Sequence, residues 1–239
     1  MQVATKTLPR TGAATARRTT VFMKLVMALS GALFVFYVLA HMYGNLKIFA
    51  GVEAYDDYAL HLRTLLTPVL PFGGFLWLFR AALLVALVAH AYSAFYLWRK
   101  ANAARPTRYV AKAAARATLR SRTMRWGGVA LLAFLVWHLI HFTWFKVNPG
   151  PDAVGDSAGL LYISSFKVWW VVLIYAVAMF ALAMHLWHGV WSASQTLGWA
   201  TSRRARTNAR AIATTIAVVT SVGFILPPLL ILVGIVKGS

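Results

Sequence analysis

The chain has 239 residues, of which 60% are hydrophobic and only 12% charged, whereas ordinary soluble domains carry about 25% charged residues. This composition excludes a soluble globular domain and indicates an integral membrane protein, and the lack of cysteine excludes disulfides and any iron–sulfur cluster held wholly by this chain. The net charge of +19 comes from short basic segments beside apolar stretches, so we expect contact with anionic lipid headgroups and no nucleic-acid binding.

The predicted elements begin with a basic tail over residues 1–20, interpreted as a disordered cytoplasmic segment because it has no periodic apolar face. Residues 21–239 form the predicted membrane domain. A hydrocarbon core of about 30 Å takes roughly 20 apolar residues to cross, and five stretches are long enough. They are residues 21–43, 72–98, 126–146, 166–190 and 211–236. The sequence therefore predicts an all-α bundle of five transmembrane helices.

The distribution of charge predicts the orientation of this bundle. Of the 24 Lys and Arg residues, five lie in 1–24, nine in 99–125 and four in 203–210, all on one side of the predicted membrane. All five acidic residues lie on the other side. By the positive-inside rule, the basic side is cytoplasmic. We therefore expect a cytoplasmic N-terminus and an external C-terminus.

Six of the seven histidines lie in or near the spans, where a polar ring needs a partner or a cavity. The first and third spans run outward, which places His41 and His138 toward the outer face. The second and fourth spans run inward, which places His90 and His185 toward the cytoplasmic face. Depth thus predicts an outer pair and an inner pair, each about 10 Å from its own face at 1.5 Å per residue.

Such pairs suit haem better than other metal centres. Zinc takes three or four protein ligands, and di-iron carboxylate centres take glutamates, which the spans lack. A haem needs one axial imidazole on each face, and two axial histidines restrict it to electron transfer. We therefore predict two haems ligated by His41 with His138 and by His90 with His185. His141 and His188 each follow a proposed ligand by three residues and are expected to pack or hydrogen-bond rather than bind iron.

Five motifs surround the histidines. They are LAHMYGNLKIFAG, GVEAYDDYALHLR, VAHAYSAFYL, VWHLIHF and MHLWHGVWSASQTLGW. Together they resemble the five-helix, dihaem cytochrome b subunit of succinate dehydrogenase and fumarate reductase. The resemblance covers residues 21–236, and HxxHGxWSxxxxxGW is its most specific part.

The resemblance implies a membrane anchor in the cytoplasmic membrane of a bacterium, with two haem b groups held by the same two histidine pairs. It implies that a flavoprotein subunit with FAD oxidises succinate and that an iron–sulfur subunit relays the electrons. This chain then passes them to a quinone, expected to be menaquinone, and performs no dicarboxylate chemistry itself. The basic loop 99–125 is expected to face the iron–sulfur subunit or lipid, and an oligomer of complexes is left open.

Residues of the first outer loop are candidates for the quinone site: His61, Arg63 and Tyr58, with Tyr55, Glu53, Asp56 and Asp57 nearby. His61 has the intrinsic pKa to exchange a proton near neutral pH, although a solvated loop histidine is an equal reading. Some dihaem fumarate reductases have a glutamate at the outer end of the second span. This sequence has no acid in that span, so the direction of the reaction is left open.

Three other functions stay open at this point. The cytochrome b subunits of hydrogenases and formate dehydrogenases also have buried histidine pairs, and an anchor without haem would keep the same helices. A transporter with histidine proton relays is disfavoured because the spans lack acids and no inverted repeat is visible.

Overall fold

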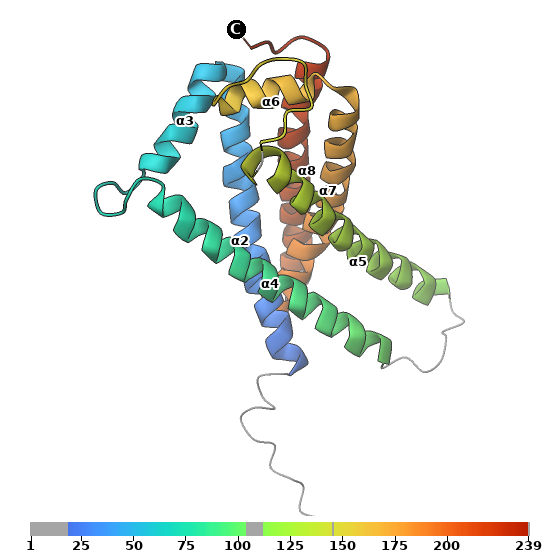
Figure 1. Cartoon of the computed structure of the whole chain (residues 1–239). Helices are drawn as coiled ribbons and strands as arrows, with labels where there is room; N and C mark the ends of the chain where they lie inside the picture. Colours follow the sequence, from blue (N-terminus) through green and yellow to red (C-terminus); the bar gives the residue numbers. More distant parts are fainter. Residues whose placement is uncertain (1–18, 104–111, 145, 239) are drawn as a thin grey trace, which may run out of the picture.

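The computed structural model describes residues 19–103, 112–144 and 146–238 (Figure 1). Within these ranges the chain forms seven α-helices and no strand. Five helices are long and apolar enough to cross a membrane, which confirms the predicted all-α fold of five membrane-spanning helices. They are α2 (Thr20–Leu46), α4 (Gly74–Ala103), α5 (Lys112–Leu139), α7 (Trp169–Thr196) and α8 (Arg203–Leu232). Residues 1–18 of the predicted disordered tail lie outside the described residues.

Four shorter elements lie at the end of the bundle that Figure 1 draws at the top, where the C-terminus also lies. They are the 3₁₀ turn η1 (Lys47–Ala50), the helix α3 (Val52–Thr64), the π-helical turn η2 (Ile140–Trp144) and the helix α6 (Ala158–Phe166). We call η1, α3 and α6 the cap. The cap closes the bundle end toward which the sequence places His41 and His138.

Helices α2, α7 and α8 pack on one another and form the centre of the bundle. Helix α4 packs on α2, and α5 packs on α7, and both cross the central helices obliquely (Figure 1). Four of these five long helices each carry one of the proposed iron ligands. The fifth, α8, closes the back of the bundle against α2 and α7.

Three helix starts differ clearly from the predicted spans. The third span is predicted from residue 126, but α5 begins at Lys112. The fifth span is predicted from residue 211, but α8 begins at Arg203, where Ser202 Oγ accepts a hydrogen bond from Ala205 N at 3.1 Å. The first turns of α8 are rich in arginine. They are helical but not apolar, so a hydropathy search does not detect them. The fourth span is predicted from residue 166, but Phe166 ends α6 and α7 begins at Trp169.

An apolar core joins the cap to the central helices. Its members are Ile48, Tyr162, Ile163, Phe166, Val171, Val172, Tyr175 and Ile231. Burying a large apolar side chain stabilises a soluble protein by about 1.5–3 kcal/mol, and this cluster lies at the end of the bundle, where water borders the membrane. We infer that hydrophobic burial holds the cap in place.

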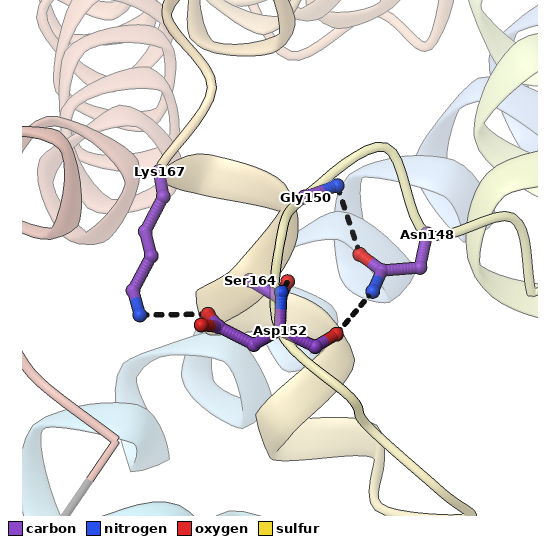
Figure 2. Close-up of polar contacts among 5 residues, drawn as sticks. All are labelled: Asn148, Gly150, Asp152, Ser164 and Lys167. Atoms are coloured by element: carbon purple, nitrogen blue, oxygen red, sulfur yellow. Dashed lines mark hydrogen bonds and ion pairs between the residues drawn. The ribbon is translucent and has the colours of Figure 1, made fainter.

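Polar contacts fix the loop that precedes α6 (Figure 2). Asn148 Nδ2 donates to the Asp152 carbonyl at 2.7 Å, and Gly150 N donates to Asn148 Oδ1 at 3.0 Å. Asp152 N donates to Ser164 Oγ at 3.1 Å, and Lys167 Nζ pairs with Asp152 Oδ2 at 2.6 Å. The loop is thereby tied to the last turn of α6 and to Lys167, which follows the helix.

Charge is segregated between the two ends of the bundle. All five acids lie in the cap or in the loop before α6: Glu53, Asp56, Asp57, Asp152 and Asp156. Basic residues gather where α4 ends and where α2, α5 and α8 begin: Lys24, Arg99, Lys100, Arg122, Arg125, Arg203, Arg204, Arg206 and Arg210. Which end faces the cytoplasm stays a prediction from the positive-inside rule.

Candidate functional site

His41 of α2 and His138 of α5 face each other below the cap. Their ring centres are 5.8 Å apart, and the ring planes are inclined by 80°. The His41 ring stacks on Tyr37 at 5.4 Å and lies 5.6 Å from the ring of Phe224. Phe134 lies 5.8 Å from His138. This pair therefore has an aromatic, largely apolar surrounding.

His90 of α4 and His185 of α7 form a second pair nearer the basic end. Their ring centres are 6.1 Å apart, and the ring planes are inclined by 56°. Two glycines adjoin these rings: a Cβ added at Gly31 would lie 3.4 Å from His90 Cε1, and one added at Gly128 would lie 3.6 Å from His185 Cε1. A methyl group at either position would be in van der Waals contact with the imidazole, so each glycine lies directly beside a ring of the pair.

The spacing of both pairs fits a shared metal atom. Two imidazoles that bind one metal from opposite sides, with bonds of about 2.0 Å, have ring centres roughly 6 Å apart. In the described part of the chain, α2 with α5 and α4 with α7 are not closely packed helix pairs, so each histidine pair meets between helices that stand apart. No three His, Cys, Asp or Glu residues gather as a metal site among the described residues, so each pair offers two ligands.

Hydrogen bonds define the protonation of His90. Ser30 Oγ lies 2.7 Å from the Val26 carbonyl and 3.2 Å from His90 Nδ1. A hydroxyl has one proton, and the carbonyl can only accept. Ser30 therefore donates to Val26 and accepts from His90, which places the proton on Nδ1 and leaves Nε2 with a free lone pair. This tautomer is the one that binds a metal through Nε2.

Its partner His185 has a buried Nδ1 with no hydrogen-bond partner among the described residues. Leaving such a group unsatisfied costs about 1–3 kcal/mol. The pair His90–His185 thus fits a haem by its spacing and by the tautomer of His90.

The other two histidines of the bundle have different surroundings. His141 in η2 is fully buried, and both ring nitrogens are hydrogen-bonded: Nδ1 to Tyr175 Oη at 3.0 Å and Nε2 to Ser165 Oγ at 2.9 Å. His188 lies edge-on to Trp187, with ring centres 4.7 Å apart. The geometry of His141 is that of a hydrogen-bonded core residue, as the sequence leads us to expect.

The quinone candidates lie on α3. His61 and Arg63 are exposed, and no hydrogen bond or ring contact joins either to a histidine pair in the part of the chain that the structure describes. Tyr58 packs against Gly44 of α2, where an added Cβ would lie 2.7 Å from Tyr58 Cε1. Burial, with a smaller contribution from the Asp56 carboxylate, raises the pKa of the Tyr55 hydroxyl above its usual range, so Tyr55 stays protonated at neutral pH.

Sequence reasoning missed several polar residues that the structure places at the site. Ser30, Ser165 and Tyr175 hydrogen-bond the histidines. Polar side chains inside apolar spans are expected to hydrogen-bond to other residues, so the sequence could have indicated that these residues have partners. The partner of each could not be named because it depends on helix rotation.

Five apolar, membrane-length helices indicate a multi-pass, all-α membrane protein, and two facing histidine pairs lie within its bundle. Comparison of the chain with protein-family models, with curated proteins and with solved structures finds no match.

Proposed function

We propose that this chain is the membrane-anchor cytochrome b subunit of a succinate:quinone oxidoreductase in a bacterial cytoplasmic membrane. The observation that carries the proposal is the presence of two facing histidine pairs, with ring centres 5.8 and 6.1 Å apart, in a bundle of five membrane-length helices. The motif resemblance supplies the enzyme family.

In this proposal His41 and His138 hold one haem b, and His90 and His185 hold the other. A haem with two axial imidazoles supplies one-electron transfer and leaves no open position for oxygen or substrate. Ser30 orients His90, and Tyr37 and Phe224 surround His41 with apolar surface. The packed cap shields the His41–His138 pair from water on its side of the bundle.

The segregated charges support the proposed arrangement in the membrane. The basic end would face the cytoplasm, where anionic lipid and the iron–sulfur subunit are the proposed partners, and the flavoprotein subunit would bind beyond it. The cap would then lie on the outer side, with Tyr58, His61 and Arg63 as candidates for contact with menaquinone. Tyr58 is the best supported of the three because it packs directly on α2 beside the outer pair.

Purification of the intact complex from detergent-solubilised membranes tests the proposal. We expect two haem b per chain in a pyridine haemochrome assay, a reduced-minus-oxidised spectrum with a b-type α band, and co-purification of a flavoprotein and an iron–sulfur subunit. Hydrogenase or formate dehydrogenase subunits in the complex would assign the chain to the alternative cytochrome b class. A complex without haem would refute both.

A further inference from the structure

We infer that Tyr175, supported by His141 and Ser165, is a positioning residue that holds His138 with its Nε2 toward the iron. The inference rests on the proposed haem ligation by His138 and extends it to residues that do not touch the haem. It follows from a chain of three hydrogen bonds at the cap end of the bundle.

These hydrogen bonds link side chains from four different elements of the structure. Tyr175 Oη of α7 lies 3.3 Å from His138 Nδ1 of α5 and 3.0 Å from His141 Nδ1 of η2. His141 Nε2 lies 2.9 Å from Ser165 Oγ of α6. Both His141 and Ser165 are fully buried, and Tyr175 is 7% exposed. No water therefore needs to be invoked to satisfy these groups.

Packing fixes the tyrosine ring. Phe134 and Phe166 each lie 4.9 Å from it, edge-on at 85° and 90°. Edge-to-face pairs of this kind are worth about 0.5–1.5 kcal/mol beyond their buried area. A ring held on two sides cannot swing its hydroxyl away from the two histidines. The π-helical turn that carries His141 is a geometry often found at functional sites.

The number of available protons determines which group donates and which accepts in each of these hydrogen bonds. Tyr175 has one hydroxyl proton, which it can donate to His138 or to His141. If His138 binds iron through Nε2, the ring proton is on Nδ1, and Nδ1–H donates a hydrogen bond to Tyr175 Oη. Tyr175 must then donate to His141 Nδ1, and His141 Nε2–H donates to Ser165. The reverse order would place a proton on His138 Nε2 and block the ligand position.

The inner pair has a simpler version of this arrangement. Ser30 Oγ accepts a hydrogen bond from His90 Nδ1 and donates one to the Val26 carbonyl. In each pair, then, one histidine is hydrogen-bonded, whereas in the described part of the chain the rings of His41 and His185 have no such bond. The two histidine pairs thus differ in the hydroxyl that accepts the hydrogen bond: Ser30 in one pair and Tyr175 in the other.

A hydrogen bond from Nδ1–H makes the imidazole a more basic ligand and favours the oxidised metal. Removal of the acceptor should therefore raise the midpoint potential of the affected haem. The test is an optical redox titration of the purified complex carrying Tyr175→Phe or Ser30→Ala. We expect two haems per chain in both variants, with a different one of the two redox components shifted upward in each.

Tyr162→Phe is the matched control, because Tyr162 lies buried in the same aromatic cluster and its hydroxyl makes no hydrogen bond to the histidines. It should shift neither component. An unchanged potential in Tyr175→Phe, or a shift of the same component by Tyr175→Phe and Ser30→Ala, would overturn the inference. Absence of two haems in the unaltered complex would instead refute the proposed function.

Ser165→Ala provides a second test of the inference if the Tyr175→Phe complex fails to assemble. This change removes only the hydroxyl that accepts the hydrogen bond from His141 Nε2, and it changes the side-chain volume little. Because hydrogen bonds in a chain polarise one another, we expect a smaller upward shift of the component assigned to His41 and His138. An unshifted component would overturn the inference.

Discussion

Asp56 of α3 binds the N-terminus of α6 at Gly159. Its Oδ1 accepts a hydrogen bond from Gly159 N at 2.8 Å, and its Oδ2 accepts one from Ser157 Oγ at 2.5 Å. Ser157 Oγ in turn accepts from Leu160 N at 3.0 Å and caps the helix. A carboxylate is favoured at this position because a helix N-terminus carries a partial positive charge. The two cap helices are therefore joined by a charge-assisted contact above the histidine pair of α2 and α5.

Asp56→Ala should destabilise the cap. It removes two hydrogen bonds to a charged group and leaves Gly159 N without this acceptor, a loss of about 2 kcal/mol. We expect a lower midpoint of thermal unfolding, measured in detergent, and earlier loss of the haem proposed to lie between His41 and His138. Asp57→Ala is the control, because Asp57 is exposed on the same helix. Equal midpoints for the two variants would contradict the structural role of Asp56.

Loss of single histidines should remove single haems. His90→Ala or His185→Ala should abolish haem binding at the inner site, and His41→Ala or His138→Ala at the outer site, because each removes one axial bond. Haem quantitation and the reduced spectrum of each purified variant provide the measurement.

His141→Ala and His188→Ala are the matched controls for the ligand series. Both should retain two haems per chain, although His141→Ala leaves Tyr175 and Ser165 without their partner and should lower stability by about 1–3 kcal/mol. Loss of a haem in His188→Ala, with retention in His185→Ala, would show that the ligand of α7 is wrongly assigned.

The sequence predicted the helices and the histidine pairings better than it predicted their surroundings. Hydropathy finds α4 because its interior is apolar, and the depth of His90 and His185 follows from counting residues along each span. The bonds from Ser30 to His90 and from Tyr175 to His138 depend on how each helix rotates about its axis, which the sequence does not define. Helix α6 was not predicted, because the fourth span was taken to begin at residue 166 and only Phe166 of α6 lies within it; the chain turns at Lys167 between α6 and α7.

The topology can be tested directly with reporter fusions. A reporter fused after Ser239 should be external, and one inserted within residues 101–120 should be cytoplasmic, because most of the basic residues lie on that side. Alkaline phosphatase and a fluorescent protein give opposite signals in the two compartments. The opposite pattern would exchange the inner and outer assignments of the two histidine pairs.

His61→Ala tests the proposed contact of α3 with the quinone. His61 is exposed on the cap and lies apart from both histidine pairs, so its loss should leave haem content unchanged. We expect lower turnover with a menaquinone analogue and unchanged succinate oxidation with an artificial acceptor that takes electrons at the flavoprotein. Leu60→Ala, at the neighbouring and also exposed position, is the control. Normal quinone turnover in His61→Ala would remove His61 from the site.

The proposed location of the quinone site at the cap predicts an effect of the membrane potential. Electrons released from succinate in the cytoplasm would have to move outward to reach a quinone near the cap. Moving one elementary charge across 100 mV is worth about 2.3 kcal/mol, and a potential that is negative inside favours outward movement of electrons. Addition of an uncoupler to intact, energised vesicles should therefore slow succinate-to-menaquinone activity, while activity with the artificial acceptor stays constant. If the uncoupler has no effect, and His61→Ala is also normal, the quinone reacts at the cytoplasmic end of the bundle instead.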